Sequence, residues 1–424
     1  MTVIRGQRTE DITSHLATVL RSLSGLASRF FRGQTSDDKI LPAAARQTYK
    51  KTAKLRHRLL SSVFCLLMKR LANPLSDLRT VAKWLVMSSV LCLLGCGKDS
   101  LYQEQGYVFG TLVEVSIYGE SEPHARQAVA AVMQEFQRLH DMLHAWKPSE
   151  LSDLNKAIAL GESKVVSPEL AAMLQDAASM SKQSQGLFNP AVGGLVQLWG
   201  FHADDFKPVQ PDEKLIAQWV SANPQMGDLS FEPVRGGVLV RSSSKAVQID
   251  LGGYAKGYAL DRAAEILKKQ GVHDALINIG GNILAIGRHG PRPWRVGIQH
   301  PRKSGALAAV DLHDGEAIGT SGDYQRYFML GGKRYCHLID PASGYPMQGV
   351  QAVTIMTRGI HAGVLSDAAS KPLFISGVQG WRAAAIRMGL TDAMLVDEAG
   401  NIHITSGMQK RLEFTDKAVK LQVE

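Results

Sequence analysis

Apolar residues recur every three or four positions between residues 122 and 143, at Ala128, Val132, Phe136 and Leu139, which predicts an amphipathic helix. Similar spacing predicts further helices over 168–184, where Ser167 and Pro168 suit an N-cap and first helical position, and over 211–221, 254–270, 366–375 and 379–388. Alternating or short apolar runs predict strands at 112–117, twice within 229–249, and at 276–279, 294–299, 307–312, 327–330, 351–356 and the chain end. Helices and strands mix without strict alternation, so the expected fold class is α+β.

A short apolar segment from Trp84 to Leu94 follows several basic residues. It is shorter than the roughly 20 residues that a transmembrane helix needs. A basic flank with a short apolar core is typical of an export signal. The segment ends in Leu93-Leu94-Gly95-Cys96, which resembles the bacterial lipobox. The alternative is a buried strand ending in an incidental cysteine. We expect residues 68–95 to be a lipoprotein signal peptide and Cys96 to be lipidated, which places the mature protein on the periplasmic side of the cytoplasmic membrane.

The positive charge belongs to the leader. The 424-residue chain has a formal charge of +9, but residues 1–95 hold 16 Lys and Arg against 5 Asp and Glu. Residues 96–424 therefore carry a net charge of −2, which argues against a nucleic-acid partner. Residues 1–67 show no readable motif, and Met68 is a more natural start, so we expect an upstream extension without stable structure. Residues 96–106 read as a polar tether, and 107–424 as the folded domain.

Four cysteines, Cys65, Cys92, Cys96 and Cys336, have no spacing that suits zinc or a disulfide framework. Cys336 lacks a recognisable partner for nucleophilic catalysis, and a buried spectator is the favoured interpretation.

Polar and glycine-rich segments supply the candidate chemistry. Asp250 to Gly257 (DLGGYAKG) precedes a predicted helix, and amides at a helix N-terminus with a lysine suit a phosphate or diphosphate. Glycines before a helix are also common in plain turns. The segment His337 to Gly344 places His337 and Asp340 at opposite ends of a predicted short strand. Asp367 is either a functional carboxylate or a carboxylate in the first turn of a helix, where the helix dipole favours it.

Seven segments in order resemble the ApbE family of FAD:protein FMN transferases, over about residues 107–405. They are SELSDLN at 149–155, GLFNPAVGGLVQLWGF at 186–201, DLGGYAKGYALD at 250–261, NIGGN at 278–282, PWRVGIQHP at 293–301, TSGDY at 320–324 and HLIDPASG at 337–344. The resemblance implies an ApbE-like flavin transferase fold, two-lobed, with mixed sheets and flanking helices.

In that family the FMN half of FAD is transferred to a Thr or Ser hydroxyl of a partner flavoprotein, AMP is released and Mg²⁺ is required. The resemblance implies an exported or membrane-bound flavoprotein as the acceptor. By position, it assigns a catalytic role to His337, with Asp340 as a second candidate, and the metal to the Gly253 carbonyl and Asp367. It assigns the FAD site to Phe109, Trp146, Leu187, Phe188, Asn189, Asp250, Lys256 and Leu338.

Several positions depart from the family pattern. Phe109 replaces Met, Trp146 replaces Tyr and Asn189 replaces Asp; aromatic and apolar exchanges preserve flavin stacking. The family has a Thr metal ligand four residues after Asp367, where this chain has Lys371. An ammonium cannot coordinate Mg²⁺, so we expect Lys371 to pair with Asp367 or touch a phosphate of FAD, and Mg²⁺ dependence to be weak. The alternative is that Lys371 points to solvent and that Ser370 or a water completes the ligand shell of the metal. Rival functions are hydrolysis of FAD to FMN and AMP, and FAD binding without catalysis.

Overall fold

A computed structural model describes residues 101–203, 205, 207–416 and 419–424. The described residues, from 101 on, belong to one compact unit. The expected extension, signal peptide and lipidated Cys96 lie outside the described residues and stay predictions. Within the described ranges, no helix is both long enough and apolar enough to span a membrane.

The largest sheet has nine strands and is antiparallel except where β15 pairs with β17. Its order is β1 (Leu101–Val108), β2 (Thr111–Tyr118), β6 (Ala275–Ile279), β7 (Asn282–Ile286), β10 (Glu316–Gly322), β13 (Val350–Arg358), β14 (Asp392–Asp397), β15 (Ile402–Ile404) and β17 (Leu421–Val423). A second sheet has the order β16 (Leu412–Phe414), β9 (Ala306–Leu312) and β8 (Trp294–Gln299).

Both faces of the large sheet are covered in its centre, as strand β13 shows. Val353 and Ile355 point into the larger hydrophobic core, whereas Ala352 and Met356 belong to a second cluster with the residues of β8 and β9. All residues of β13 from Val350 to Thr357 are buried, and because side chains alternate across a strand, both of its faces must be covered. The predicted strand at 351–356 is therefore the middle layer of the molecule.

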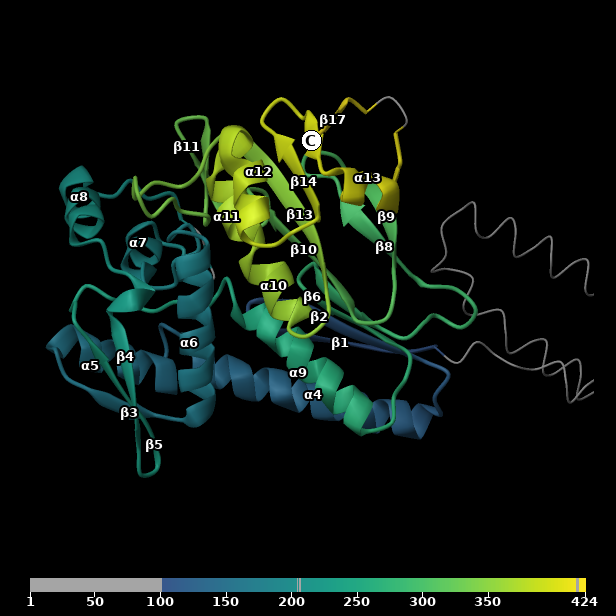
Figure 1. The fold of residues 1–424 in the computed structure, drawn as a ribbon, viewed down its shortest axis with the longest axis horizontal. Coiled ribbons are helices and arrows are strands. Elements are labelled where there is room, and N and C mark those ends of the chain that lie inside the picture. Colours follow the sequence, from purple (N-terminus) through teal and green to yellow (C-terminus); the bar gives the residue numbers. More distant parts are fainter. Residues whose placement is uncertain (1–100, 204, 206, 417–418) are drawn as a thin grey trace, which may run out of the picture. The chain divides into compact units, whose positions relative to one another are not determined.

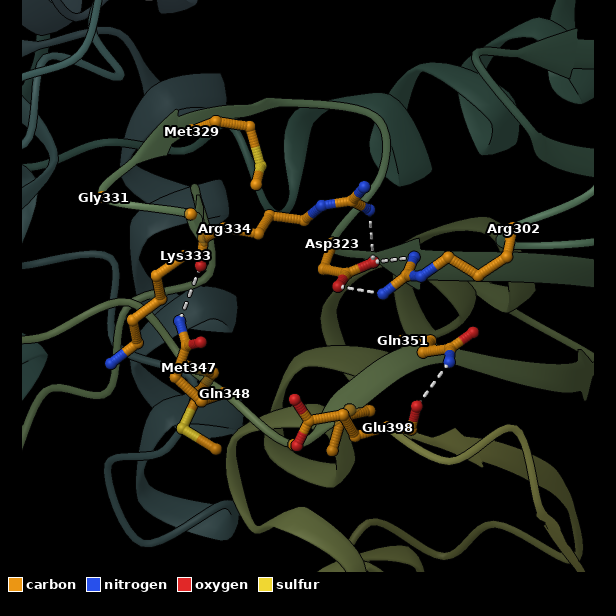
Figure 2. A pocket seen from close by; sticks show the side chains of 13 residues that line it. Arg302, Asp323, Met329, Gly331, Lys333, Arg334, Met347, Gln348, Gln351 and Glu398 are labelled. Carbon is orange, nitrogen blue, oxygen red and sulfur yellow. Dashed lines mark hydrogen bonds and ion pairs between the residues drawn. The ribbon is translucent and has the colours of Figure 1, made fainter.

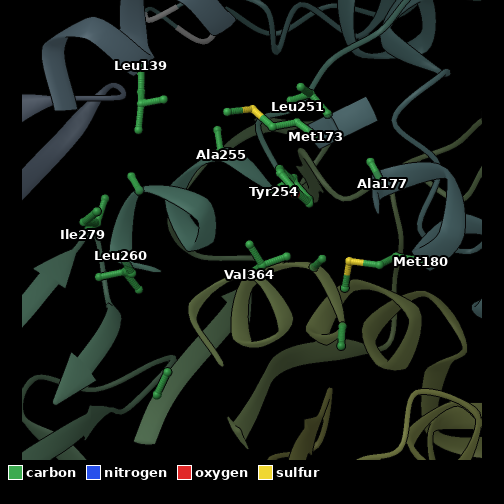
Figure 3. Close-up of a cluster of buried hydrophobic side chains, with 14 of the residues drawn as sticks. Leu139, Met173, Ala177, Met180, Leu251, Tyr254, Ala255, Leu260, Ile279 and Val364 are labelled. Carbon is green, nitrogen blue, oxygen red and sulfur yellow. The ribbon is translucent and has the colours of Figure 1, made fainter. Parts of the chain in front are cut away.

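Helices pack on the face opposite β8 and β9, and α4, α9 and α10 lie together there (Figure 1). The helices of the chain from 122 on are α4 (Glu122–Leu143), α5 (Glu150–Leu160), α6 (Pro168–Gln183), α7 (Gly193–Leu198), α8 (Glu213–Ala222), α9 (Ala255–Lys269), α10 (Ala362–Ala368), α11 (Ser370–Ile375), α12 (Gly377–Arg387) and α13 (Ser406–Arg411), with a 3₁₀ turn η2 (Met226–Asp228). Figure 3 shows Met180 of α6, Tyr254 before α9 and Val364 of α10 meeting in the core.

The second lobe is smaller and lies beside α6 (Figure 1). It holds a sheet of order β3 (Lys164–Val166), β5 (Gly237–Ser242) and β4 (Leu229–Val234). A separate apolar cluster joins α7 and α8 to the hairpin of β11 (Tyr327–Leu330) and β12 (Lys333–Cys336). The expected α+β class with mixed sheets and flanking helices is confirmed.

Two local expectations were wrong. Residues 101–106 of the expected tether belong to β1, where each residue pairs with one of β2. Much of this edge strand faces solvent and is polar, so it lacks the apolar pattern by which a strand is recognised in a sequence. The single helix expected over 366–375 is two helices, α10 and α11, that break at Ala369. Pro372 has no N–H and cannot donate a hydrogen bond to Ala368, so the helical ladder is interrupted there.

Candidate functional site

The glycine-rich segment 250–257 forms a tight turn into α9. The Asp250 carboxylate accepts a hydrogen bond from Gly252 N–H at 2.7 Å, and Lys256 Nζ donates to the Gly252 carbonyl at 3.1 Å. Tyr254 is buried, and its hydroxyl donates to Asp176 of α6 at 2.7 Å. The turn is therefore held at both ends, with Lys256 one quarter exposed beside it.

Helices α9 and α10 cross where both have glycine. A Cβ on Gly257 would press on the Gly363 carbonyl oxygen and lie 2.7 Å from Val364 Cα. Asp261 of α9 accepts hydrogen bonds from the N–H groups of Gly363 and Val364, at 2.8 and 2.9 Å, and so caps α10. Burial raises the pKa of Asp261, although the two hydrogen bonds act to lower it. The last Asp of the segment 250–261 thus fixes where α10 begins.

Because the two helices cross here, the buried Asp367 carboxylate lies at the start of α9. Asp367 lies in the last turn of α10, not at the opening of a helix as expected, and is 1% exposed. Its Oδ2 accepts from Gly257 N–H at 3.1 Å, and Lys256 Nζ lies 3.7 Å from its Oδ1. Burial would raise the pKa of Asp367, but Lys256 and Lys371 outweigh burial and hold it below its ordinary range.

Lys371 forms an ion pair with Asp367, as predicted. Its Nζ donates to Asp367 Oδ1 and, at 2.6 Å, to the Asp367 carbonyl, and its side chain is 13% exposed. Burial lowers the pKa of Lys371 to about 8, while the attraction of Asp367 raises it. Gly253 lies against the Lys371 stem, because a Cβ on it would be 3.2 Å from Lys371 Cε. The solvent-facing alternative for Lys371 is wrong.

These residues do not fit a divalent cation. Mg²⁺ requires several oxygen ligands in near-octahedral geometry. Here both carboxylate oxygens of Asp367 already accept N–H donors, one of them from the Lys371 ammonium. Among the described residues, no group of three or more His, Cys, Asp or Glu side chains could hold an ion.

His337 follows β12 in a loop, and the expected strand from 337 to 340 is reduced to a single bridge between Ile339 and Pro346. His337 is half-buried, and its Nδ1 lies 3.3 Å from the Arg326 carbonyl. Burial, with repulsion from Arg326, Lys256 and Lys371, lowers the pKa of His337 well below its ordinary value. His337 is therefore neutral near pH 7 and can accept a proton.

Asp340 stabilises a turn. Its carboxylate oxygens accept from Ala342 N–H at 3.0 Å and Ser343 N–H at 3.2 Å. An Asp side chain that bonds to the following backbone starts a turn, which is also why the expected strand ends before it. This geometry gives Asp340 a structural role, and its expected catalytic role finds no support in these contacts.

Phe109 occupies the tip of the β1–β2 hairpin with φ of +56°, and Gly110 follows at +67°. Positive φ at both central residues makes the tight turn that suits twisted strands, but it is costly for a phenylalanine. The Phe109 ring packs edge-on against Phe136 at 6.1 Å and His140 at 5.9 Å. Trp146 makes a similar contact with His202, at 5.5 Å.

The segments around Phe188 and Asp250 lie side by side. Asp250 N–H donates to the Pro190 carbonyl at 2.8 Å, and Gln248 N–H donates to that of Ala191 at 3.1 Å. Phe188 approaches Gly253, since a Cβ there would be 3.6 Å from its ring. The structure thus brings Phe188, Asp250, Gly253, Lys256, Asp367 and Lys371 together.

Three of the expected flavin residues have other local contacts. Asn189 bonds to backbone on both sides, donating to the Pro224 carbonyl at 2.9 Å and accepting from Ala191 N–H at 3.1 Å. Leu338 is buried in the hydrophobic core, and Leu187 is half-buried next to Phe188. Their part in FAD binding stays a prediction.

A pocket of about 400 Å³ lies at the β11–β12 hairpin (Figure 2). Arg302 and Arg334 approach Asp323 from opposite sides, and Arg302 binds it through two bonds of 2.7 and 2.6 Å. None of the expected FAD or metal residues lines this pocket. Two arginines hold Asp323, which makes its carboxylate a poor proton acceptor. Cys336 is buried, and burial raises its pKa to about 12, which agrees with a spectator.

Two further residues lie next to the buried carboxylate, and the sequence indicated no role for one of them, Asn282. Asn282 is 3% exposed and contributes to the lowered pKa of Asp367, so its amide faces that carboxylate. Its Nδ2 has no partner at hydrogen-bonding geometry among the described residues. Ser370 Oγ donates to the Asp367 carbonyl at 2.7 Å and lies 2.7 Å from Ser321 Oγ. Asn282 ends the segment NIGGN and Ser321 lies in TSGDY, and these positions were the available signal.

A model of the ApbE family matches residues 109–395. The FAD:protein FMN transferase of Rhodobacter capsulatus is 44% identical over 310 residues, which are 73% of this chain but 58% of that protein. The protein of the same name from Klebsiella pneumoniae strain 342 is 30% identical over 329 residues, 76% of this chain and 98% of that protein.

Solved structures agree with the fold. The ApbE protein of Thermotoga maritima has a TM-score of 0.67 at 28% identity, covering 74% of this chain and 99% of that one. The apo form of the Pseudomonas stutzeri flavinyl transferase ApbE has a TM-score of 0.64 at 27% identity, covering 74% and 97%.

Proposed function

The chain belongs to the ApbE family, and from this premise we propose that it transfers the FMN half of FAD to a Thr or Ser hydroxyl of a partner flavoprotein. The observation that carries the proposal is the junction of the glycine-rich turn, Lys256, Lys371 and Asp367 at the N-terminal end of α9. Backbone N–H groups and cations at such a position suit a diphosphate.

The reaction is a phosphoryl transfer. The acceptor hydroxyl oxygen attacks the phosphorus of the FMN half, a new P–O bond forms, and the bridging P–O bond breaks so that AMP leaves. Neutral His337 takes the hydroxyl proton. Lys256 and the turn 250–257 position the diphosphate, and Phe109, Trp146 and Phe188 offer aromatic surface to the flavin.

Mg²⁺, which the family resemblance implies, has no part in these steps, because Lys371 occupies the carboxylate that would bind it. The chemistry requires an acceptor that can present a hydroxyl to the bound FAD diphosphate. We place the reaction on the periplasmic side of the cytoplasmic membrane, with a lipid anchor at Cys96, on the strength of the signal-like segment 68–95.

The test is to incubate FAD and the chain with a flavoprotein carrying an acceptor Thr, and with a variant of that flavoprotein in which Ala replaces the Thr. Flavin fluorescence that stays with the Thr protein in denaturing gels supports transfer. AMP with free FMN indicates hydrolysis, and intact FAD indicates binding alone; either result contradicts the proposal.

A further inference from the structure

The cation that neutralises the diphosphate is part of this chain. Lys371 and Lys256 both face Asp367 Oδ1, the first in direct contact and the second at 3.7 Å. Two ammonium groups and one carboxylate leave this cluster with a net charge of +1. Lys371 already neutralises Asp367, so the partly exposed Lys256 beside them leaves a positive charge that an anionic ligand can approach.

The cluster also has a spare donor. The buried Asn282 amide interacts with Asp367, but its Nδ2 makes no hydrogen bond of full geometry among the described residues, so it has an N–H to offer a ligand. A buried amide N–H without a partner is costly unless a ligand accepts its hydrogen bond. Phosphate oxygens are suitable acceptors.

The position of Lys371 is fixed by the fold. Although α10 and α11 are separate, Ala369 between them keeps right-handed helical backbone angles, so Lys371 reaches back to Asp367. Its Nζ also donates to the Asp367 carbonyl at 2.6 Å, and Gly253 leaves room for its stem. The ammonium is thus held in place before a substrate arrives.

From these contacts we infer that Lys371 replaces a divalent metal ion in this site, and that Lys371, Lys256 and Asn282 bind the FAD diphosphate directly. The inference rests on the proposed function and adds to it that the transfer needs no divalent cation. During transfer, the lysines stabilise the charge that moves onto the bridging oxygen as AMP leaves.

The binding test titrates Mn²⁺ into the full-length chain and follows free Mn²⁺ by electron paramagnetic resonance. The variants are Lys371→Thr, which restores an oxygen ligand, and Lys268→Thr, a control on the exposed face of α9. We expect the parent and Lys268→Thr to leave Mn²⁺ free and Lys371→Thr to bind one equivalent. One tightly bound equivalent in the parent, unchanged by Lys371→Thr, would overturn the inference.

The activity test measures AMP release with acceptor present, in chelator and in Mg²⁺. The parent should keep its rate in chelator. Lys371→Met, which keeps the stem without the charge, should be slower by about 10²-fold in both conditions. Lys371→Thr should be slow in chelator and recover in Mg²⁺. A parent rate that collapses in chelator and returns with Mg²⁺ contradicts the inference.

Thermal unfolding of each variant confirms that it is folded before its rate is compared. The two proposals fail separately in these tests. If the parent leaves Mn²⁺ free and retains FAD but forms no AMP, transfer is wrong and the replacement of the metal stands. If the parent binds Mn²⁺ and transfers only with it, transfer stands and the replacement is wrong.

Discussion

The backbone N–H of Gly257 donates a hydrogen bond to the Asp367 carboxylate over 3.1 Å, which joins the first turn of α9 to the last turn of α10. The bond forms only because the two helices are in close contact. A Cβ on Gly257 would lie 2.8 Å from Asp367 Cβ. The same glycine therefore supports both the packing of the helices and the position of the carboxylate.

Gly257→Ala should lower the free energy of unfolding by about 1–3 kcal/mol, the usual cost of overpacking a close contact. Gly227→Ala is the matched control, because nothing lies within 4 Å of a Cβ there. Urea unfolding of both variants measures the difference. Equal stability of the two variants would show that the crossing can separate without cost.

Comparing Phe109→Gly with Phe109→Ala distinguishes the effect of backbone strain from the effect of losing the aromatic ring. Glycine adopts the φ of +56° without strain, whereas alanine keeps the strain of about 1–3 kcal/mol, so Phe109→Ala should be the less stable variant. Both lose the ring, and FAD affinity should fall by about tenfold in each, as expected for a lost aromatic contact. Fluorescence titration of FAD and thermal unfolding provide the two readouts. Unchanged FAD affinity in both variants would remove Phe109 from the flavin site.

His337→Ala should slow transfer by about 10²–10⁴-fold, the range for a positioned acid–base group, with little change in FAD affinity. Transfer within a few-fold of the parent would make His337 structural.

The pH dependence of the parent follows from the lowered pKa of His337, about 3. A base is active when unprotonated, so its activity is present above its pKa and is lost as pH falls through that value. The kcat/KM for FAD should therefore stay level between pH 7 and 5, measured by AMP release. A loss of activity around pH 6.5 would indicate an ordinary histidine.

Much of the fold could be predicted because amphipathic helices have a regular spacing of apolar residues. The patterns at 122–143, 168–184 and 254–270 became α4, α6 and α9 within one or two residues. The same reasoning missed β10, whose sequence EAIGTSG has few strand-forming residues. Gly319 is required there because a Cβ would strike the Ser366 carbonyl, a tertiary constraint invisible in the chain.

The site could be predicted only where residues were near in sequence. The spacing of Asp367 and Lys371 was enough to predict their ion pair. The hydrogen bond from Gly257 to Asp367 spans 110 positions and depends on the helix crossing. The sequence did not show that Asp340 also starts a turn, because a catalytic carboxylate and a turn-forming one look alike there; its catalytic role stays a prediction.

Cys96→Ser should abolish lipidation and release a soluble protein that still binds FAD, because every expected flavin residue lies downstream. Partition between detergent and water, with FAD fluorescence on each phase, measures this. A Cys96→Ser protein that still enters the detergent phase as the parent does would contradict the lipid anchor.

The central claim is that FMN passes from FAD to an acceptor hydroxyl. Its most direct test is the ratio of AMP released to flavin covalently bound, measured by chromatography and intact-protein mass spectrometry on one reaction. We predict one AMP for each flavin on the acceptor in the parent, and both products lost together in His337→Ala. AMP formed without any covalent flavin on the acceptor would contradict the account.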